Sequence, residues 1–234
     1  MLYVLLLLIA ATSVSHIEAC SCLQSHLQSL YCDADFVMQV RLRGPPEEIY
    51  RKEETEDFDE TSNSYRTFIN RRVTAIKYNV KIRQIYKLKD NSTGLDKNST
   101  VTEIFTGPND GLCGVQLFER TNYLLSGKYS NGALHIDICS SIASPWSFIT
   151  KMQKKGLRFT YKRSCDCNIQ NINYVDEVDP KACVWDPRKV DGNCYERQTA
   201  CILDKNSSTG GCKWQRNGKL KACRLDAKSK RKLP

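Results

Sequence analysis

Twelve cysteines constrain the fold of this 234-residue chain more than any other feature. An even number of cysteines in an exported chain indicates a framework of disulfides. The alternative is a zinc site built from the pairs Cys20-x-Cys22 and Cys165-x-Cys167. The oxidising route of secretion pairs thiols before a metal captures them, so it favours disulfides. The positions are Cys20, Cys22, Cys32, Cys113, Cys139, Cys165, Cys167, Cys183, Cys194, Cys201, Cys212 and Cys223.

The first residues predict export. Residues 5–11 form an apolar run that is too short to span a bilayer, and the small residue Ala19 follows a polar stretch. This pattern is typical of a signal peptide, here residues 1–19, and a buried N-terminal strand or helix is the alternative. We therefore expect a secreted, extracellular protein without a membrane span, whose mature chain begins at Cys20. Three sequons predict glycosylation at Asn91, Asn98 and Asn206.

The charge of the chain is basic, with a formal net charge of +9. In a secreted protein such an excess indicates a polyanionic extracellular matrix as partner rather than nucleic acid. The C-terminal tail carries Lys228, Lys230, Arg231 and Lys232, which could hold sulfated glycosaminoglycans. A solvated, disordered end is an equally good interpretation of the same residues.

Hydrophobic periodicity predicts a mainly β protein with short helices. The clearest strand is 73–89, in which apolar and basic residues alternate. The acidic stretch 47–60 is predicted to be a mobile, solvated loop. Several short strands suit a small closed barrel. The other predicted elements are helices at 23–31 and from Ser144-Pro145 to Gly156, and strands at 36–43, 101–106, 114–119, 122–127 and 133–138.

The remainder of the chain needs disulfides to fold. From Cys167 onward, six cysteines lie in 68 residues with little periodicity, and so short a segment buries too little core by itself. A boundary near Cys165-Asp-Cys167 therefore separates an N-terminal domain, 20–165, from a C-terminal domain, 166–234.

Catalytic motifs are missing from the sequence. There is no H-E-x-x-H, no G-x-S-x-G and no glycine-rich phosphate loop, and neither His26 nor His135 stands in a motif with a nucleophile. We expect a binding protein without catalytic residues or a cofactor of its own, not an enzyme.

The segment Cys20-Ser21-Cys22 suggests how such a protein could act. Two cysteines tied down on either side of one residue would make a free N-terminus rigid. The α-amine and carbonyl oxygen of Cys20 could then chelate a metal in a five-membered ring, such as a catalytic zinc with an open coordination position.

The chain resembles the tissue inhibitors of metalloproteinases over essentially its whole mature length. The opening Cys20-Ser-Cys22 with Cys32-Asp-Ala-Asp is similar to the opening of that family, and Leu112-Cys113-Gly114-Val115 is similar to its Val-Cys-Gly loop. Further similar motifs are Leu125-Ser-Gly-Lys128, Leu134-His-Ile-Asp-Ile-Cys139, Pro145-Trp146, Cys183-Val-Trp185 and Cys212-Lys-Trp214.

The resemblance implies a five-stranded OB-fold barrel of the netrin-module type and a small C-terminal domain. It implies an inhibitory ridge formed by Cys20, Ser21, Cys22, Leu23, Leu112, Cys113 and Gly114, in which Cys20 binds the zinc of the protease and Ser21 enters its S1′ pocket. It also implies the disulfides Cys20–Cys113, Cys22–Cys139, Cys32–Cys165, Cys167–Cys212 and Cys183–Cys201, which leaves Cys194–Cys223.

The sequence departs from the family pattern in places. Leu23-Gln24 stands where the family usually has a proline. The family has two cysteines shortly after the one that matches Cys167, whereas this chain has none before Cys183.

The resemblance predicts a monomeric, stoichiometric inhibitor of zinc metalloproteinases of the metzincin type. The alternatives are a non-inhibitory netrin-type module that binds matrix or a receptor, and a secreted signalling ligand.

Overall fold

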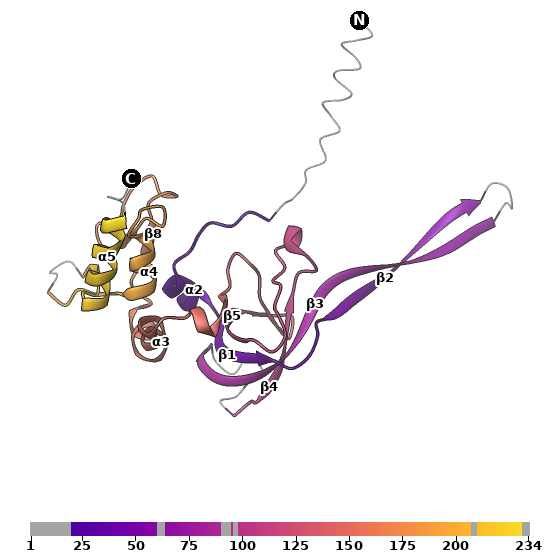
Figure 1. Cartoon of the computed structure of the whole chain (residues 1–234). Coiled ribbons are helices and arrows are strands. Elements are labelled where there is room, and N and C mark those ends of the chain that lie inside the picture. Colours follow the sequence, from indigo (N-terminus) through magenta and orange to yellow (C-terminus); the bar gives the residue numbers. More distant parts are fainter. Residues whose placement is uncertain (1–19, 60–63, 90–94, 96–97, 207–209, 231–234) are drawn as a thin grey trace, which may run out of the picture.

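A computed structural model describes residues 20–59, 64–89, 95, 98–206 and 210–230. Its centre is a closed barrel of five strands (Figure 1). The strands pair in the order β1-β3-β4-β6-β5, and β5 pairs with β1 to close the barrel. Among the barrel pairings, only that of β4 with β6 is parallel. This is the connectivity of an OB-fold, so the predicted fold class is confirmed. The strands are β1 (Phe36–Leu42), β3 (Ser64–Leu88), β4 (Val101–Thr106), β5 (Asn122–Ser130) and β6 (Ala133–His135).

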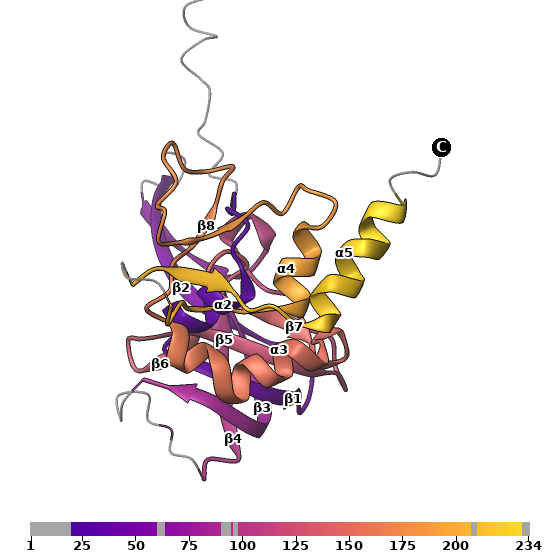
Figure 2. The ribbon, with the colours of Figure 1, turned by 90° about the vertical axis from the view of Figure 1, so that its left-hand side faces the viewer.

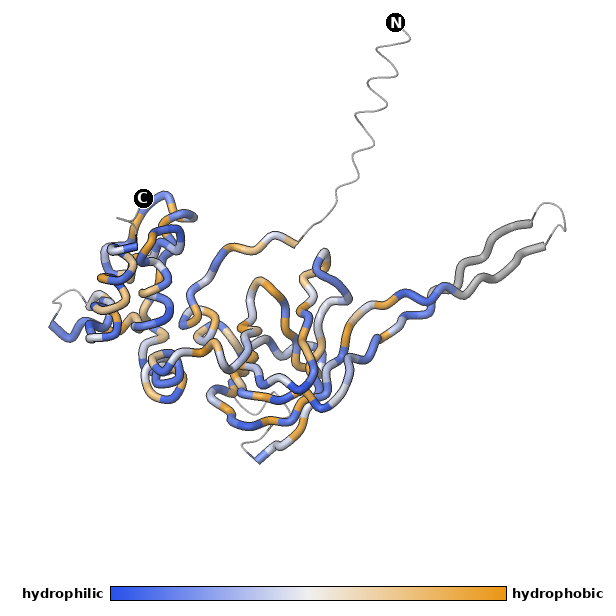
Figure 3. The backbone as a smooth tube through the Cα atoms, in the orientation of Figure 1, coloured by the Kyte–Doolittle hydropathy of each residue, from blue (hydrophilic) through white to orange (hydrophobic). Residues whose placement is uncertain are grey.

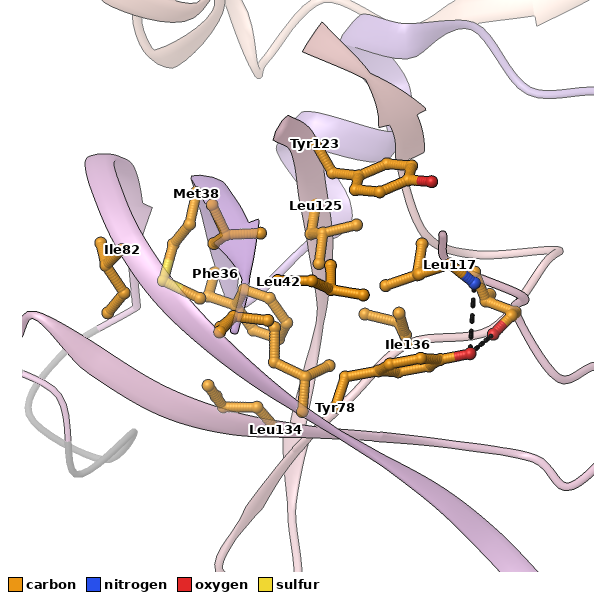
Figure 4. Packing of buried hydrophobic residues seen from close by; sticks show 14 residues of the cluster. Phe36, Met38, Leu42, Tyr78, Ile82, Leu117, Tyr123, Leu125, Leu134 and Ile136 are labelled. Carbon is orange, nitrogen blue, oxygen red and sulfur yellow. Dashed lines mark hydrogen bonds between the residues drawn. The ribbon is translucent and has the colours of Figure 1, made fainter. Parts of the chain in front are cut away.

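Apolar side chains at alternate positions of these strands fill the barrel interior. In β1 the side chains of Phe36, Met38 and Val40 are fully buried, and Tyr78 and Val80 of β3 meet them (Figure 4). Each large apolar side chain that leaves water in this way stabilises the fold by roughly 1.5–3 kcal/mol. Two register shifts in the β1–β3 pairing bend the long strand β3 around the barrel, because a bulge kinks the strand that carries it.

The acidic stretch is a strand, which corrects the prediction of a mobile loop over 47–60. Strand β2 (Glu47–Asp59) pairs antiparallel with the first half of β3 and forms a twisted ribbon that projects from the barrel (Figure 1). The part of the ribbon next to the barrel carries both hydrophilic and hydrophobic residues (Figure 3). The prediction was wrong because it weighed charge alone. The backbone of residues 47–59 pairs with residues 64–77 of β3, and residue types there such as Tyr65, Phe68 and Ile69 favour a strand.

Residues 114–119 form no strand, although Val115 and Leu117 are buried as the alternation predicts. Side chains satisfy their backbone groups instead. The Tyr78 hydroxyl donates to the carbonyl of Val115 at 3.0 Å and accepts from the N–H of Leu117 at 3.1 Å (Figure 4). The Thr106 hydroxyl accepts from the N–H of Val115 at 2.9 Å. A periodic pattern cannot distinguish this arrangement from a strand.

The predicted helices are displaced along the chain. The first is α2 (Leu27–Asp33), so Leu23 lies outside it and is 62% exposed. Ser144 and Pro145 belong to strand β7 (Ala143–Pro145) and do not begin a helix. The cap is Thr150, whose side chain accepts from the N–H of Gln153 in a capping box. After β7 the chain forms η3 (Trp146–Phe148), then α3 (Lys151–Lys155), which Thr150 caps, the π-helix η4 (Gly156–Thr160) and η5 (Tyr161–Ser164).

The C-terminal part folds around disulfides and two tryptophans. Its two small sheets pair β8 with β9 and β10 with β11. Trp185 is buried, and its indole N–H donates to the carbonyl of Gly192 at 3.1 Å. Cys194–Cys223 ties the two helices together. The elements are β8 (Ile169–Asn171), β9 (Cys183–Trp185), α4 (Gly192–Gln198), β10 (Cys201–Leu203), β11 (Cys212–Trp214) and α5 (Gly218–Lys230).

The C-terminal elements pack against one end of the barrel, beside α2 and α3 (Figures 1 and 2). Ala200 and Ile202 belong to the same apolar cluster as Leu27 and Tyr31 of α2, so the core continues past the predicted boundary at residue 165. The position of that boundary stays a prediction. Within the described residues, no helix has the length and apolar character needed to cross a membrane.

Candidate functional site

Two loops at one end of the barrel present cysteines to the segment Cys20–Cys22. The first loop contains η2 (Asp110–Leu112), which Asn109 caps by accepting from the N–H of Leu112. Cys113 follows in a left-handed conformation with φ of 57°. In the second loop the Asp137 carboxylate accepts from the N–H of Cys139 at 2.8 Å. A hydrogen bond of 3.1 Å from the N–H of Ile138 to the carbonyl of Cys113 joins the two loops.

Both disulfides of the segment lie side by side. Cys20 is bonded to Cys113 and Cys22 to Cys139, with Cα–Cα distances of 5.3 and 4.9 Å. The Sγ of Cys20 is also only 3.4 Å from the Sγ of Cys139. The remaining four are Cys32–Cys165, Cys167–Cys212, Cys183–Cys201 and Cys194–Cys223. Five of the six pairs are those that the resemblance implies, and Cys194–Cys223 is the pair that was left over.

The predicted ridge residues differ in their exposure. The side chains of Ser21, Leu23 and Leu112 are exposed, and Leu112 is 51% accessible. Gly114 is buried, and a Cβ there would lie 2.3 Å from the carbonyl oxygen of Gly107. Gly114 therefore permits the close approach of two backbone segments behind the ridge. It offers no side chain to a partner.

Ile138 is an exposed residue beside the ridge that the sequence analysis did not select. It is 44% exposed and its backbone bonds to Cys113. It is the last residue of the predicted strand 133–138. The strand ends at His135, however, and the turn around Asp137 directs the chain outward. The only sequence signal was its position next to Cys139.

The residues after the ridge are held by the C-terminal part. The Asn171 side chain donates to the carbonyl of Gln24 at 3.0 Å. Gln28 is 1% exposed, and its amide nitrogen donates to the carbonyls of Cys201 at 2.9 Å and Ser164 at 3.2 Å. Its amide oxygen accepts from the N–H of Cys201 at 2.9 Å. Gln28 thus binds the edge of β10 through both polar groups of Cys201, as a neighbouring strand would.

His26 completes this contact as the cap of α2. Its Nδ1 accepts from the N–H of Gln28 at 3.1 Å, so the proton belongs on Nε2, which lies 3.5 Å from the carbonyl oxygen of Tyr195. The rings of Trp185 and Trp214 lie 5.4 and 5.3 Å away. Burial lowers the pKa of His26 from 6.5 to about 4, and the Tyr195 carbonyl opposes this only in part. His26 is therefore neutral at physiological pH.

The cysteines cannot hold a metal in this state. Three sulfurs, those of Cys20, Cys22 and Cys139, lie close enough together for a common ligand, as do those of Cys167, Cys201 and Cys212. All twelve cysteines are in the described part of the chain and each is in a disulfide, so no thiolate is available.

Two of the exposed ridge residues, Ser21 and Leu23, therefore lie on a segment anchored at both ends. Disulfides hold residues 20 and 22, and polar contacts to the C-terminal part hold residues 24–28. Of the predicted sequons, Asn98 and Asn206 are exposed, whereas Asn91 lies outside the described residues.

Comparison with known proteins places the chain in a family. The family model for "Tissue inhibitor of metalloproteinase" matches residues 18–214. The chain is 29% identical to Metalloproteinase inhibitor 2 of Homo sapiens over 215 residues, which cover 90% of this chain and 87% of that protein. It is 26% identical to Metalloproteinase inhibitor 3 of Scyliorhinus torazame over 216 residues, which cover 91% and 88% respectively. The chain therefore belongs to the tissue inhibitor of metalloproteinase family.

Proposed function

We propose that this protein is a secreted, monomeric inhibitor that binds zinc metalloproteinases through the N-terminus of its mature chain. The observation that carries the proposal is the anchored segment Cys20–Leu23, and membership of the tissue inhibitor of metalloproteinase family supports it. The relatives are named as metalloproteinase inhibitors, which supports the same activity here. An inhibitor of this kind needs no catalytic residue or cofactor of its own.

In the proposed mechanism, cleavage after Ala19 frees the α-amine of Cys20. The amine and the carbonyl oxygen of the same residue coordinate the zinc of the protease, at the position where a catalytic site binds water. Ser21 enters the S1′ pocket beside that zinc, and the apolar side chains of Leu23 and Leu112 contact the protease. The Cys20–Cys113 disulfide stabilises the complex by removing freedom that a loose terminus would lose on binding.

The mechanism requires an unprotonated amine. A free α-amine has a pKa of about 7.7–8.0, so part of it is neutral near pH 7. The metal and a proton compete for the same lone pair, and acidification therefore weakens binding. If one proton competes, the loss below about pH 7 reaches ~1.4 kcal/mol per pH unit.

The test is to insert one alanine between Ala19 and Cys20, confirm the extended N-terminus by sequencing, and titrate the protein against a metalloproteinase catalytic domain. An extension turns the amine into an amide, whose lone pair is a poor ligand. We expect a loss of affinity of at least roughly a thousandfold, the scale of about 4 kcal/mol. A protein with one alanine added after Pro234 is the control. Full inhibition by the N-terminally extended protein would exclude the chelation mechanism.

The same experiment addresses the non-inhibitory alternative, a netrin-type module that binds matrix or a receptor. That alternative predicts that the unextended protein, with Cys20 confirmed as its first residue, does not inhibit any member of a metalloproteinase panel. It also predicts that the added alanine changes no binding property.

A further inference from the structure

Positive charge is concentrated in the last helix, α5, and in the residues just before it. Residues 213–230 contain seven lysines or arginines and a single acidic residue, Asp226. Three of these cations are in ion pairs: Lys213 with Asp204, Arg224 with Asp191 and Lys230 with Asp226. Within the described residues the other four have no ion pair. They are Arg216, Lys219, Lys221 and Lys228.

Three of the four unpaired cations line a single hollow. Arg216, Lys221 and Lys228 border a space of about 610 Å³ together with Leu220 and Leu225, and no acidic residue lines it. Lys221 and Lys228 are seven residues apart in α5, so they lie on one face about 10.5 Å apart along the axis. The cations thus form a row along an open depression.

The helix that carries the row is firmly attached. Leu220 is buried, and the Cys194–Cys223 disulfide ties α5 to α4. The Arg224 guanidinium lies 3.0 Å from the Asp191 carboxylate and over the ring of Tyr195, at 5.4 Å from its centroid. Arg224 therefore anchors the helix, and the charges beside it are available to a ligand.

We propose that this hollow, defined by Arg216, Lys221 and Lys228, is a docking site for a sulfated polysaccharide. A linear polyanion matches an open row of cations without counter-charges. An acidic protein segment is less suited, because protein interfaces are depleted in lysine and rely on buried apolar anchors. The exposed face of the hollow offers one large apolar side chain, Leu225, at 60% exposure.

This site differs from the C-terminal tail that the sequence suggested. Of the tail residues, Lys230 is paired with Asp226, while Arg231 and Lys232 lie outside the described residues. Arg216 and Lys221 precede the tail, just before the last helix and at its start, respectively. The helix α5 lies at the opposite end of the molecule from the β2–β3 ribbon (Figure 1). None of the hollow residues belongs to the proposed inhibitory ridge, so the proposal does not depend on the inhibitory mechanism.

The test compares two triple variants that lose the same charge. The first is Arg216→Gln, Lys221→Gln and Lys228→Gln. The second is Arg41→Gln, Lys81→Gln and Arg83→Gln on the outer face of the barrel, where three exposed cations also lack an ion pair within the described residues. Binding of size-defined heparin is measured against salt concentration, with polyglutamate of matched charge as a second probe. Inhibition of a metalloproteinase is measured in parallel.

We expect the hollow variant to bind heparin at least roughly tenfold more weakly, as the loss of three exposed charge contacts implies, and to inhibit like the wild type. The barrel variant should stay within about threefold of the wild type, and the salt dependence should be shallower only for the hollow variant. Equal losses in both variants would show that only net charge matters and would overturn the proposal. Tighter binding of polyglutamate than of heparin would overturn it in favour of an acidic protein segment.

Discussion

Replacing Gln28 by alanine is expected to destabilise the folded protein strongly. The variant leaves both the N–H and the carbonyl of Cys201 without their bonds to the Gln28 side chain, in a region where Gln28 itself is 1% exposed. The carbonyl of Ser164 still accepts from the N–H of Cys167, so losing Gln28 as its other donor contributes less to the destabilisation. A buried polar group without a partner costs about 1–3 kcal/mol, and two of them give a loss of about 2–6 kcal/mol in the free energy of unfolding.

The assay is chemical denaturation with the disulfides intact. Gln28→Met separates the hydrogen bonds from the packing, since it fills the space but leaves Cys201 unpaired, and we expect it to remain at least about 2 kcal/mol less stable than the wild type. Gln84→Ala is the control, because Gln84 is exposed and its side chain donates to the carbonyl of the adjacent residue, Ile85. A methionine variant as stable as the wild type would refute the argument that these hydrogen bonds hold the barrel and the C-terminal part together.

Two other expectations concern the cysteine pair and the buried histidine. In Cys113→Ser the freed Cys20 thiolate can attack Cys139 at 3.4 Å and release Cys22, so peptide mapping after an acid quench should find both Cys22–Cys139 and Cys20–Cys139. The double variant with Cys20→Ser should keep only the first pair, and a single pairing in both variants would contradict the exchange. Below pH 6.5 His26 binds a proton in the unfolded chain, whereas in the folded protein, where its pKa is about 4, it stays neutral until the pH approaches 4. Stability should therefore fall by up to about 3 kcal/mol between pH 6.5 and 4. Paired unfolding curves should show a smaller fall in His26→Gln, and parallel curves would exclude this origin.

The barrel strands were predictable because their residues alternate. Phe36, Met38 and Val40 in β1 and Tyr78, Val80 and Ile82 in β3 face one core, and period-2 burial is a local property that a single sequence displays. The β2–β3 ribbon was not predictable from the composition of residues 47–60, since its stability comes from pairing with residues 64–77. Five disulfide pairs came from the family resemblance and Cys194–Cys223 was left over, because cysteine spacing leaves the connectivity open.

The attachment behind the ridge had no readable signal in the sequence. Gln28 lies in the first turn of the short helix α2 and His26 caps that helix, and a pattern analysis predicts that such polar residues are exposed. They are buried because their partners, Cys201 and Tyr195, lie more than 160 residues away in the chain. Long-range polar contacts of this kind depend on the completed fold.

Leu23 occupies a special position between the two anchors of its segment. Cys22 is held by a disulfide on one side, and Gln24 is held by Asn171 on the other, yet the Leu23 side chain is 62% exposed. Its exposure therefore belongs to a restrained backbone. A partner that covers Leu23 and Leu112 would gain roughly 1.5–3 kcal/mol for each side chain buried completely. Little ordering of the backbone would offset that gain, since both neighbours are already held. Anchors from the barrel and from the C-terminal part thus act on the same few residues, and loosening either one should weaken the binding that we propose for the ridge.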